Sequence, residues 1–322
     1  QRREGGEEPD EIEGPMGPTS SLQHCSYVRQ VMGEIGGVWG RSRFMGLAPG
    51  REVPAHIDIH YYWRTHFRIH IPVITNPGVL FTCGGETVHM AAGECWLFDS
   101  FRWHDVQNKG SDQRIHLVLD TVGGGRLPNL MKAAEGSAAE PQFIQPDTRN
   151  ARPLEFETVN SPKVMSPWEM RCHLAFIREN AGDDPLIIST LDRVEDFVAL
   201  WAAAWARFGT DDSGRTTYEG LLRDVQADTS SFRVNQLKMP NGMHLIRTLR
   251  ELLFNMALAD PHRRFAGRDT DSKAKALPAK PAIQQASPSA PRSIREEFDR
   301  PIFVVSTPRS GSTLLYETLT QA

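Results

Sequence analysis

The chain has 322 residues, of which 40 are acidic and 36 basic, and its formal net charge is −4. This length is typical of roughly two domains with a sizeable core. The slightly negative net charge lacks the excess of basic residues that is typical of nucleic-acid binding proteins. The sequence has no apolar run of about 18 residues that would span a membrane, and its four scattered cysteines, with no CxxC pair, favour a reduced, cytoplasmic protein.

The N-terminal half is expected to contain a short tail followed by a β domain. Residues 1–20 are acidic and rich in glycine and proline, and they offer almost nothing to bury, so we expect a disordered tail. Residues 21–160 are assigned to the β domain, because many short apolar runs between turn residues are typical of a sandwich or jelly roll. The expected strands are 38–47, 52–63, 65–74, 78–83, 94–100 and 113–120.

The pattern becomes helical over residues 161–266. Ser166 is suited to an N-cap, Pro167 to the first helical position and Glu169 to a capping box. Apolar residues then recur at steps of three and four, as in an amphipathic helix. They are Leu191, Val194, Val198, Trp201, Trp205 and Phe208, and a second set is Leu245, Ile246, Leu249, Leu252, Leu253 and Met256.

Two further segments complete the chain. Residues 267–300 are rich in proline, alanine, lysine and serine without periodicity, which is typical of a linker. In residues 301–322 an apolar run precedes the loop TPRSGST and a helix-like segment, an arrangement suited to holding an anion. This row resembles the 5′-phosphosulfate loop of sulfotransferases. We interpret it as the stump of a sulfotransferase-like domain, because such a domain needs about 200 more residues.

The segment from residue 54 to residue 72 carries unusual ionisable residues for a strand. Side chains alternate between faces, so Arg68 and His70 lie on one face, and Ile69 and Ile71 on the other. Arg and neutral His are suited to holding carboxylates and metals, so we expect the polar face to line a cavity rather than meet solvent. The residues assigned to this polar face are His56, Asp58, His60, Arg64, His66, Arg68 and His70.

Three residues have the layout of a metal site. His56 and Asp58 are two positions apart and so share a strand face, and His104 follows 46 residues later. Two histidines and one carboxylate form the facial triad of non-haem Fe(II) oxygenases, which leaves metal positions open. Arg114, ten residues after His104, could pair with the far carboxylate of 2-oxoglutarate through a bidentate contact.

These motifs, taken together, resemble the aspartyl/asparaginyl β-hydroxylase family. The family consists of Fe(II)- and 2-oxoglutarate-dependent dioxygenases on a double-stranded β-helix, so the resemblance implies a mainly β jelly roll, here with an appended α-helical region. The likeness covers about residues 38–122. The motifs are His56-x-Asp58, Arg68-Ile-His70-Ile-Pro72, Gly93-x4-Phe98-Asp99-Ser100, His104-Asp-Val-x-Asn108 and the row RIHLVLD at 114–120.

The resemblance implies roles for individual residues. His56 and His104 would be iron ligands, and Arg114 would bind the distal carboxylate of 2-oxoglutarate. His70 would lie at the metal-binding end of that co-substrate, and Arg68 would contact a substrate carboxylate. Asp58 departs from the animal enzymes, which have glycine there, and matches bacterial members with a complete triad. The membrane anchor and helical repeats of the animal enzymes are absent, which favours a small substrate.

The expected function is therefore hydroxylation of an aliphatic C–H bond, using Fe(II), 2-oxoglutarate and O₂. The surplus of cations, with Arg64 and His66 beside Arg68, indicates a small anionic substrate such as a free or N-acylated amino acid. One alternative is a peptide or protein β-hydroxylase. Another is a non-catalytic cupin-like binding module attached to a sulfotransferase. Neither a nucleic acid nor a membrane is expected as a partner, and the sequence does not define an oligomeric state.

Overall fold

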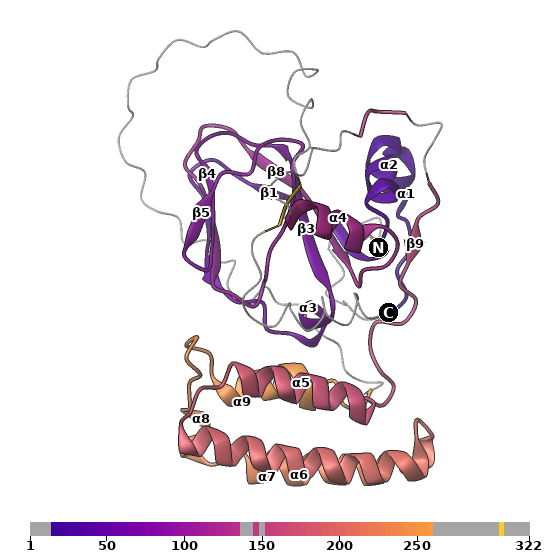
Figure 1. Cartoon of the computed structure of the whole chain (residues 1–322), viewed down its shortest axis with the longest axis vertical. Helices are drawn as coiled ribbons and strands as arrows, with labels where there is room; N and C mark the ends of the chain where they lie inside the picture. The colour runs from indigo at the N-terminus through magenta and orange to yellow at the C-terminus, as the bar shows by residue number, and fades with distance from the viewer. Residues whose placement is uncertain (1–13, 136–143, 148–151, 260–302, 306–322) are drawn as a thin grey trace.

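The protein combines a two-sheet jelly roll with a layer of helices. A computed structural model describes residues 14–135, 144–147, 152–259 and 303–305. The two sheets lie above the helical layer (Figure 1). The jelly roll with an appended helical region agrees with the sequence-based expectation. The strands form two sheets rather than one closed barrel, and the molecule is mixed α/β rather than mainly β, because helices cover the larger sheet as well.

The larger sheet has six strands in the order β10-β6-β3-β8-β1-β9, and the smaller has four in the order β2-β7-β4-β5. The strands of the larger sheet are β1 (Val38–Leu47), β3 (Phe67–Ile74), β6 (Cys95–Leu97), β8 (Arg114–Thr121), β9 (Glu155–Phe156) and β10 (Phe303–Val305). Those of the smaller sheet are β2 (Glu52–His56), β4 (Val79–Cys83), β5 (Glu86–Val88) and β7 (His104–Asn108).

The register of the larger sheet separates polar from apolar side chains. Arg68 of β3 lies opposite Asp120 of β8, and His70 lies opposite Val118. Since paired residues point to the same face, the basic residues of both strands share one face. The other face packs on helices α1 (Ser20–His24), α2 (Ser26–Ile35) and α4 (Leu127–Glu135). The core there contains Met32, Ile35, Ile69, Leu97, Leu117, Leu119, Leu127 and Leu130.

One expected strand is interrupted. The sequence pattern predicts a single strand over residues 52–63, but β2 ends at His56 and helix α3 (Tyr61–Thr65) follows. The ring of His60 accepts a hydrogen bond from the backbone N–H of Tyr62 and so caps this helix. The strand alternation that we extended through Arg64 and His66 is therefore wrong, and their positions depend on α3.

The N-terminal segment is partly ordered. The backbone N–H of Met16 donates to the carbonyl of Glu157 at 2.8 Å, and that of Gly14 donates to Oδ1 of Asn160 at 2.7 Å. Residues 14–20, which we expected to belong to a disordered tail, are thus held against the chain near β9. Residues 1–13 lie outside the described residues.

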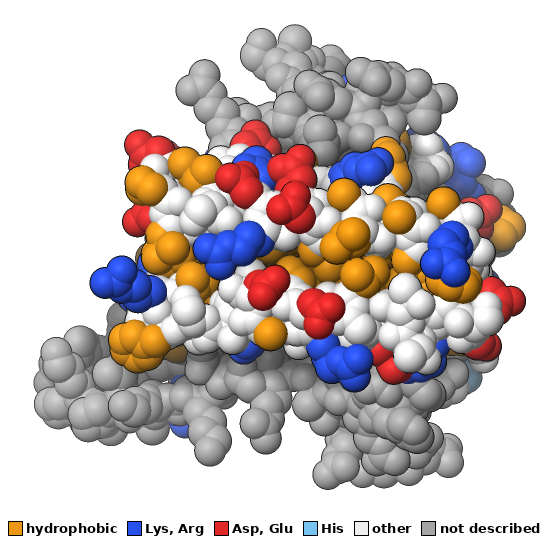
Figure 2. Space-filling view, turned by 90° about the horizontal axis from the view of Figure 1, so that it is seen from below, with side chains coloured by type: hydrophobic (Ala, Val, Ile, Leu, Met, Phe, Trp, Pro, Cys, Tyr) orange, Lys and Arg blue, Asp and Glu red, His pale blue; other side chains and the backbone are white. Residues whose placement is uncertain are grey.

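The region after residue 161 is helical, as expected. Its elements are α5 (Pro167–Glu179), α6 (Pro185–Phe208), η2 (Asp212–Gly214), α7 (Arg215–Asp228), α8 (Phe232–Asn235), α9 (Leu245–Leu249) and η3 (Arg250–Phe254). Ser166 accepts from the backbone N–H of Glu169 and caps α5 as predicted. On α6 the predicted stripe is buried up to Trp201, whose indole N–H donates to the carbonyl of Met165 at 2.8 Å. Figure 2 shows the underside of the molecule, where acidic and basic side chains are interspersed.

The jelly roll and the helical region share a core. Ile57 and Tyr61, which follow β2, are both buried in the cluster that contains the helical residues Met170, Phe176 and Leu249. The segment that carries two of the predicted metal ligands is thereby packed on the helices. The helical region is consequently part of the structural support of the site.

The C-terminal segment differs from the expected separate unit. Residues 303–305 form β10, which pairs in parallel with β6 of the jelly roll. The linker at 267–300 and the phosphosulfate-like loop lie outside the described residues. Among the helices that the structure describes, none is long and apolar enough to cross a membrane.

Candidate metal and anion-binding site

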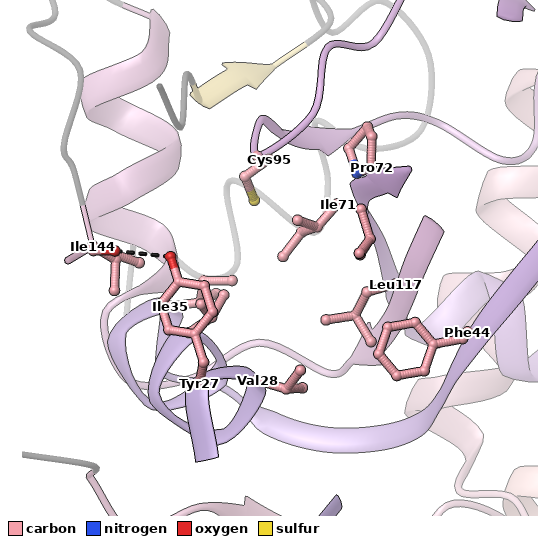
Figure 3. Close-up of a pocket in the computed structure, with 12 residues that line it drawn as sticks. Tyr27, Val28, Ile35, Phe44, Ile71, Pro72, Cys95, Leu117 and Ile144 are labelled. Carbon is pink, nitrogen blue, oxygen red and sulfur yellow. Dashed lines mark hydrogen bonds between the residues drawn. The ribbon is translucent and has the colours of Figure 1, made fainter. Parts of the chain in front are cut away.

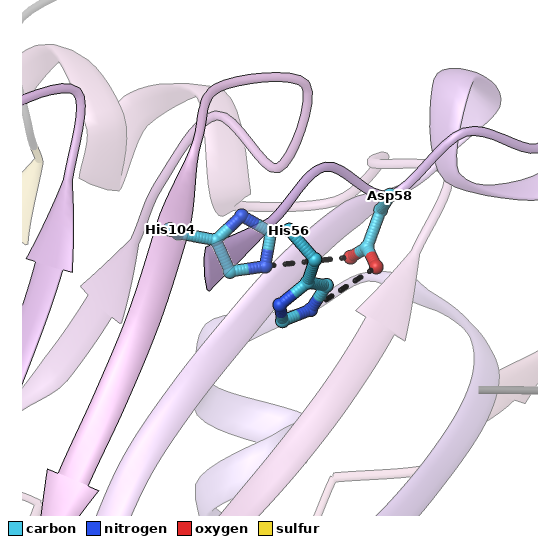
Figure 4. A group of neighbouring side chains, drawn as sticks. All are labelled: His56, Asp58 and His104. Atoms are coloured by element: carbon cyan, nitrogen blue, oxygen red, sulfur yellow. Dashed lines mark ion pairs between the residues drawn. The ribbon is translucent and has the colours of Figure 1, made fainter. Parts of the chain in front are cut away.

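His56, Asp58 and His104 come together at one end of the smaller sheet. His56 ends β2 and lies directly opposite His104, the first residue of β7, and their ring centroids are 4.2 Å apart. Asp58 follows two residues after His56, and its backbone N–H donates to the carbonyl of Ser100 at 3.0 Å. One potential ligand atom from each of the three residues lies within 4.8 Å of the others (Figure 4).

Backbone carbonyls orient both imidazoles. Nδ1 of His56 lies 2.8 Å from the carbonyl oxygen of Pro54, and Nδ1 of His104 lies 2.8 Å from that of Arg102. Because a carbonyl only accepts, each Nδ1 must carry the proton, and each Nε2 keeps its lone pair. The Nε2 atoms of His56 and His104 lie 3.8 and 3.9 Å from the carboxylate oxygens of Asp58. The two lone pairs and one carboxylate therefore face a common point.

The charge of the cluster suits a cation. Burial lowers the pKa of His104, and the nearby carboxylate of Asp58 only partly opposes this effect. A neutral imidazole is the form that binds metals. Asp58 is 8% exposed and is held by Arg68, whose Nη1 donates to Oδ2 at 2.7 Å. Two imidazoles and a carboxylate form the donor set of non-haem iron sites and leave several positions open for other ligands.

Arg68 is already engaged by the protein. Its Nε donates to Oδ1 of Asp120 at 3.0 Å, in addition to the bond to Asp58, and its guanidinium carbon lies 4.0 Å from the ring centroid of Trp63. The substrate contact that the family resemblance implies for Arg68 is therefore not supported by its contacts. The geometry instead makes Arg68 the link between the metal cluster and the central strand β3.

A second group of buried side chains, made of His70, Arg114 and His116, lies beside this cluster, and we call this group of side chains the basic pocket. Arg114 is 4% exposed, and its Nη2 donates to Nδ1 of His116 at 2.7 Å. Since Nδ1 of His116 accepts, its Nε2 carries the proton. Within the part of the chain that the structure describes, this Nε2, Nε of Arg114 and Nδ1 of His70 have no hydrogen-bond partner. Buried donors without partners are rare, so this pocket has the character of an anion site.

The electrostatics of the pocket reinforce that conclusion. Burial lowers the pKa of Arg114 to about 10, and burial together with the charge of Arg114 lowers the pKa of His116 to about 2. Burial also holds the pKa of His70 well below its usual value. Arg114 is thus a cation among neutral imidazoles, with no carboxylate in ion-pair contact among the described residues. The ring of Phe98 is 5.1 Å from both His70 and His104 and connects this pocket to the metal cluster.

The remaining candidates, Arg64 and His66, line a second pocket together with Asp58. The ring nitrogens of His66 face the carbonyl of Tyr62 at 2.7 Å and the carboxylate of Glu157 at 2.6 Å. Through these contacts His66 connects α3 to Glu157, the residue that follows β9, so its role is structural. Arg64 stands with its guanidinium carbon 4.1 Å from the ring centroid of Phe176 on α5, and it lines a pocket that also includes Asp58.

Sequence reasoning missed three residues around the site. Asp120 shares the strand parity of Arg114 and His116, and that alternation could have identified it. Glu157 and Phe176 carry no such signal, because they reach the site from distant segments of the chain. Their contributions to binding His66 and Arg64 depend on tertiary packing alone.

A larger cavity of about 170 Å³ lies on the opposite, apolar face of the six-stranded sheet (Figure 3). Its lining is almost entirely apolar, and the hydroxyl of Tyr27 donates to the carbonyl of Ile144 at its edge. It is lined by none of the residues assigned to the metal cluster or the basic pocket. The lining comes from α2, β1, β3, β6 and β8, with Val28, Val31, Ile35, Phe44, Ile71, Cys95 and Leu117 among its members.

Residues 17–123 match the family model described as aspartyl/asparaginyl beta-hydroxylase. The matched segment contains the metal cluster, Arg114 and the β-strands around them, and it ends before the helical region. This match supports the resemblance seen in the motifs and supports an oxygenase. No curated protein matches the chain significantly.

Solved structures with partial similarity are double-stranded β-helix or cupin proteins and a dioxygenase. A cupin 2 conserved barrel protein from Salinispora arenicola is 18% identical, with 25% of this chain and 60% of that chain covered and a TM-score of 0.21. A double-stranded β-helix protein from Klebsiella pneumoniae is 16% identical, with 28% and 71% covered and a TM-score of 0.22. A salicylate 1,2-dioxygenase from Pseudaminobacter salicylatoxidans is 14% identical, with 38% and 39% covered and a TM-score of 0.23.

Proposed function

We propose that this protein is an Fe(II)- and 2-oxoglutarate-dependent hydroxylase that acts on an aliphatic C–H bond of a small carboxylate substrate. The observation that carries the proposal is the joint presence of two features. One is the two-histidine, one-carboxylate cluster, and the other is the buried basic pocket beside it. A metal cluster alone would fit many proteins, whereas the neighbouring cation without a counter-ion calls for an anionic ligand.

The residues present fit ferrous iron. His56 and His104 would each offer an Nε2 lone pair, and Asp58 would offer a carboxylate oxygen. This donor set is typical of iron sites that keep positions open for a co-substrate and oxygen. Asp58 would be held in place by Arg68, which is the kind of supporting contact that orients metal ligands.

The basic pocket fits a dicarboxylate such as 2-oxoglutarate. Arg114 would bind the carboxylate farther from the metal, with the N–H of His116 as a second donor. His70 of that pocket would contact the metal-binding end of the co-substrate, because Phe98 lies against the rings of both His70 and His104. Burial of Arg114 strengthens this recognition, because an ion pair in a desolvated pocket is worth more than one in water.

When bound, iron, 2-oxoglutarate and O₂ together supply the oxidising chemistry: one oxygen atom enters the substrate C–H bond, and the co-substrate leaves as succinate and CO₂. The protein's residues position these groups and keep water away. Phe81 and Phe98 contact each other and the rings of His70 and His104. This aromatic wall supports a dry site between the two sheets.

The arginine that neither the co-substrate nor Asp58 occupies indicates the substrate class. Arg114 is assigned to the co-substrate and Arg68 to Asp58, so Arg64 is left on the substrate side of the cluster. A free or N-acylated amino acid, hydroxylated at its β-carbon, would supply both a carboxylate and an aliphatic C–H bond. A peptide or protein substrate remains the competing hypothesis, and the same experiment addresses it.

The test is a turnover screen with the full chain reconstituted with Fe(II) under exclusion of oxygen. Amino acids, N-acyl amino acids and short peptides are supplied with 2-oxoglutarate and air, and succinate and hydroxylated products are measured. Succinate formation that depends on one of the small compounds supports the proposal. Preference for peptides would favour the protein-hydroxylase alternative. Iron binding without any consumption of 2-oxoglutarate would favour a non-catalytic cupin-like module.

A further inference from the structure

The cavity on the apolar face of the six-stranded sheet is formed by helix α2 together with four strands. Its lining includes Ile35 of α2, Phe44 of β1, Ile71 of β3, Cys95 of β6 and Leu117 of β8. Figure 3 shows these side chains reaching from the helix and from the strands toward one shared space. The cavity is thus built by regular elements of the fold rather than by a single loop.

The lining of this cavity offers almost nothing to a polar ligand. None of the described residues that line it carries a charged side chain. Burial raises the pKa of the Cys95 thiol to about 12, so this group is also uncharged at neutral pH. The hydroxyl of Tyr27 already donates to the carbonyl of Ile144 at the edge. An ordered water needs roughly two to four polar partners, so the lining is suited to a hydrocarbon group instead.

The volume of the cavity limits the size of such a group. At about 170 Å³, it is slightly larger than an apolar cavity of about 150 Å³ that admits benzene, so about six carbon atoms fit. Protein interiors contain few spaces larger than a water molecule, because atoms that line them lose dispersion contacts. A hydrocarbon ligand would restore those contacts.

The exposure of the lining indicates where a ligand would enter. Phe44 lines the cavity and yet is 51% exposed, and Val28 and Val31 on α2 are only partly buried. The cavity therefore opens to solvent beside these residues. An aliphatic chain that enters with its apolar end first would leave a polar head at this opening, in contact with water.

The cavity is separated from the metal cluster and the basic pocket by the sheet itself. Ile71 of β3 lies opposite Leu117 of β8, and both line the cavity. His70 and His116, the residues just before them, belong to the basic pocket. Since successive side chains of a strand point to opposite faces, a ligand in the cavity would not compete with one in the basic pocket.

We propose that this cavity binds the hydrocarbon end of a small aliphatic ligand of about six carbon atoms, whose polar head lies at the opening beside Phe44. The ligand is recognised by its shape and by the absence of a polar group at its inserted end. The inference is independent of the proposed hydroxylase function, because no residue of the metal cluster or the basic pocket lines the cavity.

The experiment compares two probes of equal length, 1-hexanol and 1,6-hexanediol. Each is titrated into the full chain, and binding is followed by ligand-observed NMR. The wild type is expected to bind 1-hexanol with a dissociation constant on the order of 0.1–1 mM, from the burial of about six carbon atoms. The diol should bind at least about 10-fold more weakly, because one of its hydroxyls would be buried without a partner.

A filling substitution tests the location of the site. Val31→Phe adds atoms inside the cavity and should remove most of the 1-hexanol binding. Val159→Phe is the matched control, because Val159 is 80% exposed and does not line the cavity, and it should bind 1-hexanol like the wild type. Circular dichroism establishes whether each variant is folded. The comparison of the two probes in the wild type remains decisive if Val31→Phe does not fold.

The titration of the wild type is repeated with 2-oxoglutarate and Zn(II) present. The affinity for 1-hexanol should not change, because these compounds would occupy the other face of the sheet. Displacement of 1-hexanol would place it in the basic pocket and overturn the proposal. The absence of 1-hexanol binding, equal affinities for the two probes, or full binding by a folded Val31→Phe variant would overturn it as well.

Discussion

Nη1 of Arg68 donates to Oδ2 of Asp58 at 2.7 Å, which ties the carboxylate of the metal cluster to the central strand β3. The same guanidinium binds Asp120 on the adjacent strand β8. All three side chains are largely buried. The carboxylate is thus positioned by a network within the sheet before any metal binds, and the two histidines are positioned by backbone carbonyls.

Replacement of Arg68 by alanine is expected to weaken metal binding and to destabilise the fold. The change leaves the buried carboxylates of Asp58 and Asp120 without their partner, which typically costs about 3–5 kcal/mol. Urea unfolding measures the loss of stability, and titration with Mn(II) measures metal affinity. Arg68→Lys keeps the charge but not the fork that spans both acids, so it should rescue only in part. If Arg68→Ala raised the KM of the substrate alone, the substrate contact implied by the family resemblance would stand.

Replacement of His104 by alanine is expected to abolish hydroxylation and to weaken Fe(II) binding sharply. The variant removes one of the two Nε2 lone pairs that face Asp58. Metal content after dialysis and succinate release are the measurements. His24→Ala is the control, because His24 is an exposed histidine on α1, and it should retain both properties. Full activity in the His104 variant would rule out the assigned cluster.

Replacement of Arg114 by alanine is expected to raise the KM for 2-oxoglutarate with little change in metal affinity. Loss of a buried charged contact costs about 2–5 kcal/mol, or roughly 30-fold to several thousandfold in affinity. Arg114→Lys should restore little, because lysine lacks the bidentate fork. Steady-state kinetics at varied 2-oxoglutarate, with Mn(II) titration alongside, provide the test. An unchanged KM would mean that another group binds the co-substrate.

Acidification is expected to destabilise the protein partly through His173. This residue of α5 is 4% exposed, and both ring nitrogens lack a hydrogen-bond partner in the described part of the chain. Burial and the charge of Arg64 lower its pKa to about 3. The unfolded chain takes up a proton near the usual pKa of about 6.5 while the folded chain does not, so stability is lost as the pH falls below that value.

The contribution of His173 can be isolated by substitution. His173→Leu should reduce the stability difference between pH 6.5 and pH 5 by about 2 kcal/mol, since each unit of pH is worth about 1.4 kcal/mol for one group. Unfolding is followed in urea with a chelator present, so that protons released by metal binding do not contribute. Oε1 of Glu169, whose pKa is raised by burial, lies 4.0 Å from Nε2 of His173, so the comparison is made with Glu169→Gln in both proteins to remove that second titration. An identical pH profile would show that His173 is accessible to protons in the folded state.

The sequence by itself determined the pattern of the strands and the chemistry of the cluster. Strand β1 has the predicted bounds, and Ile69 and Leu117 are buried on the face opposite the basic residues. Strand alternation has a fixed period of two, so hydrophobic and polar faces can be read directly. The donor types of His56, Asp58 and His104 predicted a metal site, although β2 ends at His56 and Asp58 lies outside the strand.

Only the tertiary structure decided how the charges are distributed among partners. Arg64 and Arg68 have the same side chain, four positions apart, yet Arg68 forms ion pairs with Asp58 and Asp120, whereas Arg64 forms none with the described residues. Arg64 lies in helix α3, where strand alternation was expected, and Phe176 comes from a helix more than a hundred residues away. Such contacts depend on packing between distant segments, which no local periodicity encodes. Which carboxylates contact each arginine can therefore be determined only from the folded structure.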